Sequence, residues 1–403
     1  MDRYKSFFRG IAYAGYCIVF LFAVYTFEKS IPDQIYVKAG ETIDYQFQVP
    51  VTMEIQEDSS PVAKSTNNAN VRQSYIVTCR LFGIFPVKDI EVVLVDGDAV
   101  YAGGMPIGIY VKTSGVLVIG TSEVERPDGS EAAPAENILK AGDYILSVNG
   151  EKVAEKEDLQ RLVQQNGAEK EILKINRKGE EVEVGVTPVQ NKNGTYMLGA
   201  WVRDDLAGIG TLTYYKEDGT YGALGHAVSD GDVGERIQMR EGYVYNAQII
   251  GVKKGQKGNP GELSGMIRYQ SADCLGTIEE NTDIGIYGKL DGNIAALPHG
   301  DYYNICYKQD IKQGPATIIC GFTGEKKEYA IEIESLDYSG REANKGILFR
   351  VTDEQLLDMT GGIVQGMSGS PILQDGKIIG AVTHVFVSDS SMGYGIFIEN
   401  MVE

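Results

Sequence analysis

The sequence predicts a mainly β protein that is divided into several domains. The chain has 403 residues, of which 49 are glycine. Short runs rich in valine, isoleucine and tyrosine alternate with the small and polar residues that usually form turns between strands. No long stretch shows the apolar periodicity of helices. A chain of this length usually folds as about two to four domains, each with its own core.

An uncharged apolar run occupies residues 10–27 and follows Arg3, Lys5 and Arg9. At about 1.5 Å per residue this run can cross a bilayer as a helix. The positive-inside rule then places the N-terminus in the cytoplasm and the bulk of the chain across the membrane. Residues 1–30 are therefore expected to be a short tail and a transmembrane signal anchor. A cleavable signal peptide is the alternative, although no small-residue cleavage motif follows the run.

Residues 31–100 are expected to form a small β domain. Apolar and polar residues alternate at 45–50 and again at 74–82, as in half-buried strands. Between them lies a polar segment at 58–70, which reads as an exposed loop and a site where the chain could be cut. An inert surface loop explains the same composition.

Residues 101–192 resemble a PDZ domain. The resemblance is carried by Leu-Lys-Ala-Gly-Asp-Tyr-Ile-Leu-Ser-Val-Asn-Gly at 139–150, a strand between two turns. Leu159, Leu162 and Val163 follow at helical spacing. In such domains a peptide adds as a strand and a loop receives its carboxylate. That loop is predicted to consist of Gly104, Met105, Pro106, Ile107 and Gly108. A PDZ domain that only packs against its neighbours is the alternative.

The sequence Gly-Met-Ser-Gly-Ser-Pro at 366–371 precedes two apolar strands joined by a turn. It resembles the nucleophile loop of trypsin-like serine peptidases, in which a tight turn presents a serine. Ser368 is the predicted nucleophile, and the backbone N–H groups of Gly366 and Ser368 are the predicted oxyanion hole. A nearby glycine lets the backbone approach closely, because no Cβ intervenes. Ser370 is the nearest rival nucleophile.

A serine nucleophile needs an imidazole to accept its proton, and the chain has three histidines. His226 stands among glycine, alanine and serine, which leave room for a substrate, and it is the predicted general base. His299 follows a proline in a predicted loop. His384 lies in an apolar run and is predicted to be an ordinary surface or satisfied core residue.

Taken together, Gly-His at 225–226, residues 258–262 and the block at 351–387 resemble the family of stage IV sporulation protein B. These are signalling serine peptidases of endospore-forming bacteria. The resemblance runs from the membrane segment to the C-terminus. It implies a trypsin-like double β-barrel peptidase domain at 193–403, with His226 and Ser368 as base and nucleophile. It also implies that Asp353 is the acidic partner of His226.

The position of Asp353 leaves its role open. It precedes Ser368 by only a short stretch, unlike the acidic residue of ordinary trypsin-like peptidases. It also stands directly before a predicted helix, where aspartate commonly caps the N-terminus. Asp230 and Asp232, which follow His226 closely, are rivals for the role of orienting the imidazole.

Composition excludes several other classes. The net charge is −19, with no basic cluster beyond the first ten residues, so nucleic acid is not an expected partner. The five cysteines are widely separated and have no C-x-x-C pair or suitably spaced histidine. No zinc site or other cofactor is therefore expected, and the spacing leaves disulfide pairing undecided.

The predicted function is that of a membrane-anchored serine endopeptidase. The resemblance implies that it cleaves itself and a membrane-bound regulator of an intramembrane protease, which triggers processing of a late sigma factor. It implies a location between the forespore and mother-cell membranes, with release by cleavage. One alternative is a quality-control peptidase of the HtrA type, in which the PDZ domain usually follows the protease. Another is a non-catalytic PDZ scaffold, against which the intact Ser368 and His226 argue.

Overall fold

The computed structural model describes residues 31–38, 51–55, 62–64, 72–95, 99–291 and 301–402. Strands dominate these residues, which confirms the mainly β character of the predicted fold. No helix in this part of the chain is long and apolar enough to span a membrane. The predicted anchor at 10–27, most of the predicted loop at 58–70, and His299 lie outside the described residues.

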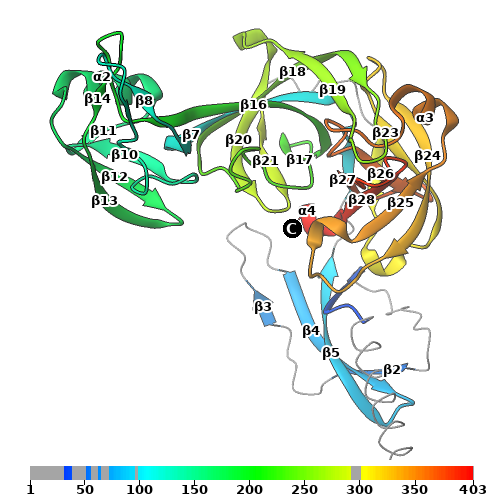
Figure 1. Ribbon diagram of the computed structural model, residues 1–403. Helices are drawn as coiled ribbons and strands as arrows, with labels where there is room; N and C mark the ends of the chain where they lie inside the picture. Colours follow the sequence, from blue (N-terminus) through cyan, green and yellow to red (C-terminus); the bar gives the residue numbers. More distant parts are fainter. Residues whose placement is uncertain are drawn as a thin grey trace, which may run out of the picture.

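The N-terminal part is a five-stranded sheet with the order β1-β5-β4-β2, and β3 pairs with β4. Its core contains Ile35, Val77, Ile90 and Val92. The strands β4 and β5 form a long hairpin that projects away from the rest of the molecule (Figure 1). The bounds are β1 Gln34–Lys38, β2 Val51–Ile55, β3 Val62–Lys64, β4 Arg72–Leu81 and β5 Phe85–Val95.

The PDZ unit is inserted between two long strands, β7 (Pro106–Thr121) and β16 (Ala200–Tyr215). Its core joins the far half of each strand to one face of helix α2 (Lys156–Asn166), which contributes Leu159 and Leu162. This confirms the predicted PDZ domain. The remaining strands are β8 Val124–Glu125, β9 Glu131–Ala132, β10 Tyr144–Val148, β11 Glu151–Lys152, β12 Glu171–Arg177, β13 Glu180–Val186, β14 Val189–Gln190 and β15 Tyr196–Met197.

The remainder of the chain belongs to a closed barrel with two main parts. One core lies among the first strands and contains Ile107, Leu212 and Val244. Its strands are β6 Ala99–Ala102, the near halves of β7 and β16, β17 Thr220–Ala223, β18 Met239–Lys253, β19 Glu262–Ile267, β20 Cys274–Thr282 and β21 Gly285–Leu290.

The second part of the barrel is built from the C-terminal strands and helix α3 (Glu354–Thr360). Its core contains Ile331, Phe349 and Val382. The strands are β22 Tyr302–Ile305, β23 Gly314–Cys320, β24 Lys327–Leu336, β25 Ile347–Val351, β26 Pro371–Gln374, β27 Lys377–Val385 and β28 Met392–Phe397, followed by helix α4 Glu399–Val402.

The strands β7 and β16 each run from the PDZ unit into the barrel (Figure 1), and their pairing has register shifts at Trp201–Val202 and at Arg203–Asp205. At the PDZ end Val202 pairs with Val118, and at the barrel end Thr211 pairs with Pro106. Two adjacent strands that share one ladder make a stiffer connection than a flexible linker would. The PDZ unit and the barrel are therefore joined by a continuous two-stranded ribbon.

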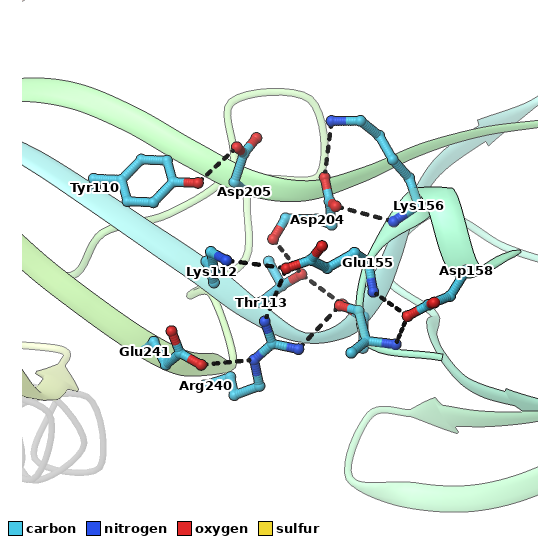
Figure 2. A network of polar contacts seen from close by, with 12 residues as sticks. Tyr110, Lys112, Thr113, Glu155, Lys156, Asp158, Asp204, Asp205, Arg240 and Glu241 are labelled. Carbon is cyan, nitrogen blue, oxygen red and sulfur yellow. Dashed lines mark hydrogen bonds and ion pairs between the residues drawn. The ribbon is translucent and has the colours of Figure 1, made fainter. Parts of the chain in front are cut away.

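A network of polar contacts links this ribbon to the start of α2 (Figure 2). The buried carboxylate of Asp204 accepts hydrogen bonds from the backbone N–H of Lys156 at 2.9 Å and from its Nζ at 3.1 Å. Arg240 on β18 donates to the carbonyl of Ala154 at 3.1 Å, and Lys112 pairs with Glu155 at 3.0 Å. These contacts connect α2 to three strands of the barrel.

Candidate active site

Ser368 lies on the tight turn that leads into β26. Gly369, at φ +97°, has the left-handed backbone that favours glycine. A Cβ at this position would lie 2.0 Å from the carbonyl oxygen of Thr211. Glycine is therefore required where the turn passes against β16.

The two predicted oxyanion donors make no hydrogen bond within the described part of the protein. Within the described residues, the backbone N–H groups of Gly366 and Ser368 have no hydrogen-bond acceptor, and both residues line the same cavity. The turn is held from behind by Thr211, whose Oγ1 donates to the carbonyl of Gly366 and whose N–H donates to that of Ser368, each at 2.9 Å. Thr211 thus fixes the carbonyls and leaves both N–H groups available to an oxyanion.

His226 follows β17 and lines this cavity together with Ser368. Its Nδ1 lies 2.8 Å from the carbonyl oxygen of Ala227. A carbonyl can only accept, so Nδ1 carries the proton and Nε2 of the neutral ring is free to act as a base. Burial lowers the pKa of His226, which favours the neutral form.

The cavity has a volume of about 580 Å³ and lies between the two parts of the barrel. Strands β7 and β16 and the segment around His226 form one wall. The other wall is formed by residues 363–368 and by 383–387, so residues far apart in the sequence converge here. Ser368 donates its hydroxyl proton to the carbonyl of Thr383 at 2.7 Å, and not to His226. The nucleophile and the base share a cavity but are not hydrogen-bonded in this conformation, which is common in ligand-free peptidases.

The chain matches the model of a known protein family. The model of the family described as SpoIVB peptidase S55 matches residues 194–402, which is more than half of the chain. The chain belongs to the SpoIVB peptidase S55 family. This confirms the predicted family and supports a serine peptidase as the class of enzyme. A PDZ family model also matches, at residues 127–177. No curated protein matches the chain.

Solved structures give weaker likenesses to this SpoIVB-type chain. The HtrA-type protease AlgW with a decapeptide has 13% identity and a TM-score of 0.28, covering 74% of this chain and 62% of its own. A mutant of AlgW with a decapeptide has 10% identity and a TM-score of 0.29, at 74% and 61% coverage. An inactive mutant of Rv3671c from M. tuberculosis H37Rv has 12% identity and a TM-score of 0.24, at 48% and 80% coverage. The chain spans about three fifths of the length of the AlgW chains.

Among the described residues of this SpoIVB-type peptidase, no carboxylate is hydrogen-bonded to His226. Asp353 caps helix α3 by accepting from the N–H of Leu356 at 2.9 Å, and it does not line the cavity. Asp230 is buried and is paired with Arg203, while Asp232 pairs with the same guanidinium at 3.1 Å. The carbonyl of Ala227 occupies the place at Nδ1 that an acidic partner would take. The role implied for Asp353 stays a prediction.

Substituting Asp353 with asparagine and with alanine separates its role as a helix cap from a role in orienting His226. Asparagine caps helices as well as aspartate, so Asp353→Asn is expected to keep the unfolding temperature of the parent. Asp353→Ala is expected to lose about 1 kcal/mol of stability, measured by urea unfolding. Loss of peptidase activity in a fully stable Asp353→Asn variant would assign the orienting role to Asp353 in an active conformation.

The structure places His384, predicted to be an ordinary surface or core residue, beside His226 in the cavity. Its half-buried ring lines the cavity, with its centroid 5.2 Å from that of His226. Its Nδ1 is buried without a hydrogen-bond partner in the described residues. Burial, with smaller effects from His226 and Lys345, lowers the pKa of His384 to about 4, while Glu342 opposes this. The site therefore holds a second imidazole that is neutral near pH 7, and no motif in the sequence indicated it.

The predicted carboxylate-binding loop of the PDZ domain is also corrected. The segment from Gly104 to Gly108 (Gly104, Met105, Pro106, Ile107 and Gly108) lies in the barrel and not in the PDZ unit. The N–H of Gly104 donates to Leu212 at 2.7 Å, and its carbonyl accepts from Gly321 at the same distance. Ile107 is buried in the barrel core. The error arose because β7 is much longer than one PDZ strand, and only its second half enters the PDZ core.

The segment that lies beside α2 in the PDZ unit is Tyr196 and the start of β16. The N–H of Tyr196 donates to the side-chain oxygen of Gln164 at 3.0 Å, and Ala200 and Val202 pack on the PDZ core. In the strand registers of the described part of the chain, Ala200–Arg203 of β16 pair only with β7. A peptide strand could add to the PDZ unit only at an unpaired edge of this kind.

Proposed function

We propose that this chain is a serine endopeptidase in which Ser368 is the nucleophile and His226 the general base. The observation that carries the proposal is that Ser368, His226 and Gly366 line one cavity, and that the backbone N–H groups of Gly366 and Ser368 have no acceptor within the described part of the chain. Nucleophile, base and oxyanion donors are the three parts that acyl transfer requires. Membership of a peptidase family supports the same conclusion.

The reaction begins when the Ser368 hydroxyl turns from the carbonyl of Thr383 toward Nε2 of His226. As Oγ bonds to the scissile carbonyl carbon, its proton moves to Nε2 and the carbonyl oxygen becomes an oxyanion. The N–H groups of Gly366 and Ser368 donate to that oxyanion. The carbonyl of Ala227 stabilises the imidazolium through Nδ1–H. His226 then protonates the leaving amine, and water releases the acyl group from Ser368 with His226 again as base.

The physiological role in the proposal is that of a membrane-anchored signalling peptidase. Residues 10–27 would hold it at the membrane, with the bulk of the chain in the space between forespore and mother-cell membranes. It would cleave itself and a membrane-bound regulator of an intramembrane protease, and so trigger processing of a late sigma factor. The PDZ unit would bind a peptide segment of a protein partner. The support is family membership and the presence of a PDZ domain.

The first test is self-cleavage and active-site labelling of the full chain. Intact mass should show processing of the parent and none in Ser368→Ala. A fluorophosphonate should label the parent at Ser368, located by peptide mass, and should still label Ser370→Ala. Ser370 is the matched control because its side chain is buried beside the same turn. Folded parent protein that neither cleaves itself nor takes the label would favour the PDZ scaffold.

The role in sporulation has a separate test in cells that make this protein. Ser368→Ala should block processing of the late sigma factor while the protein accumulates uncut. Normal processing in that strain would reject the signalling role and leave a general peptidase of the HtrA type as the better description.

A further inference from the structure

The hairpin of β4 and β5 ends in an exposed apolar tip. Residues 81–86, Leu-Phe-Gly-Ile-Phe-Pro, carry no charge. The side chains of Phe82, Ile84 and Phe85 are 63%, 68% and 64% exposed. The turn is tight, with Phe82 at φ 54° and Gly83 at φ 72°, so these exposed apolar residues lie close together along the chain. Soluble proteins rarely expose several large apolar side chains at one point without a partner for them.

The charged groups near the tip are already paired. Arg80 contacts Glu54 at 2.6 Å, and Lys88 contacts Asp33 at 2.7 Å. Neither pair lies within residues 81–86. The whole chain also carries a net charge of −19, which repels anionic surfaces. A partner of the tip is therefore recognised by apolar contact and not by charge.

The path of the chain indicates which apolar surface is within reach. Strand β1 runs parallel to β5, with Gln34 opposite Glu91, so residues before Gln34 lie toward the tip. The Nζ of Lys88 donates to the carbonyl of Ile31 at 2.6 Å, which fixes this entry point. The apolar run ends at residue 27. At up to about 3.5 Å per residue its end lies within about 14 Å of Ile31. The tip lies about 10 Å beyond Lys88 by the rise of a strand.

We infer that this tip inserts into the lipid surface beside the chain's own membrane anchor. The inference rests on the anchor in the proposed function. Moving one large apolar side chain from water into lipid raises the membrane–water partition coefficient by about tenfold or more. Three such side chains alone bind a membrane weakly, but the anchor makes their insertion intramolecular and raises their effective concentration. The tip thus adds a second membrane contact that is insensitive to salt.

A second contact would fix how the peptidase stands on the membrane. A single membrane contact does not fix the orientation of the domains relative to the bilayer. The β4–β5 hairpin projects away from the barrel (Figure 1), and β5 spans about 35 Å at the rise of a strand. With its tip in the lipid, the hairpin would hold the barrel at a set distance from the bilayer.

The test uses the full chain in phosphatidylcholine vesicles and a tryptophan probe at the tip. The only tryptophan, Trp201, is exposed and is first replaced by Trp201→Phe. Phe85→Trp is then compared with Ile250→Trp, a position on β18 that is 68% exposed. Lipids brominated in the upper acyl chain should quench the fluorescence of Phe85→Trp at least twofold and leave that of Ile250→Trp unchanged, at both low and high salt.

The outcomes separate the anchor from the tip. Chain that floats with the vesicles but shows no quenching at Phe85→Trp would reject the lipid contact and retain the anchor. Blue-shifted emission that depends on protein concentration, without quenching, would point to a second copy of the chain instead and would also reject it. Chain that fails to float would overturn both the anchor and the inference, while activity on soluble peptides would leave the peptidase assignment intact.

Discussion

Replacing His226 with glutamine is expected to lower kcat/KM by at least about a thousandfold. Glutamine keeps polarity and approximate size but cannot take the proton of Ser368, so the loss measures general-base catalysis. Hydrolysis of a peptide taken from the self-cleavage site gives the measurement. The matched control is Asp232→Asn, which changes an exposed side chain close to His226 that contacts Arg203 and not the cavity. It should retain activity within about twofold.

The pH profile of the parent tests the same assignment. Only neutral His226 accepts a proton, so activity falls as the imidazole is protonated. Burial disfavours the charged ring and lowers the pKa of His226. The acid limb of kcat/KM should therefore have its midpoint below about 6.5, the ordinary value for histidine. A midpoint above that value would contradict a buried base and would indicate a carboxylate that stabilises the charged ring.

Sequence motifs singled out Ser368 and His226, which the structure places in one cavity, because the predicted roles of both depend on local chemistry. Gly-Met-Ser-Gly-Ser-Pro specifies a turn that presents Ser368, and a histidine set among small residues indicates a cavity. The role of Asp353 could not be decided in this way, because the same residue that could orient His226 also caps α3. Capping depends on the next few residues of the chain, whereas contact with His226 depends on how two distant segments pack.

The PDZ error has a different physical origin. The motif at 139–150 correctly indicated a PDZ domain, but its boundary could not be found from alternation of apolar residues. Strands β7 and β16 each pass from one core into another as a single strand, so no turn marks the boundary. His384 was missed for a similar reason. An apolar strand predicts burial, and it says nothing about a cavity that forms only when 226 and 384 meet.

Strand β16 also carries Thr211, a residue of the site that could not be identified from the sequence. Thr211 lies at the barrel end of β16, and its hydroxyl and N–H hold the carbonyls of Gly366 and Ser368. The strand that begins in the PDZ core thus ends against the nucleophile turn. Thr211 does not touch the reacting atoms and acts as a positioning residue, because each carbonyl that it holds belongs to a residue whose own N–H is a predicted oxyanion donor.

Thr211→Val should lower kcat about ten- to a hundredfold with KM nearly unchanged. Valine keeps the shape of threonine but loses the hydrogen bond to Gly366, and a loosened oxyanion hole weakens only the transition state. The control is Thr213→Val on the same strand. Thr213 is fully buried and its Oγ1 has no hydrogen-bond partner in the described residues, so this change should leave kcat intact.

A conservative variant and hydrogen exchange separate positioning from simple loss of packing. Thr211→Ser keeps the hydroxyl and should recover most of kcat, although it loses a methyl group from the core. Amide exchange of residues 363–370 should accelerate in Thr211→Val and not in Thr213→Val, because only the first releases the turn. Equal losses in the two valine variants, or no rescue by serine, would show that Thr211 serves packing alone. Exchange reports on the turn whether or not peptide is hydrolysed, so this role of Thr211 can be judged independently of the peptidase assay.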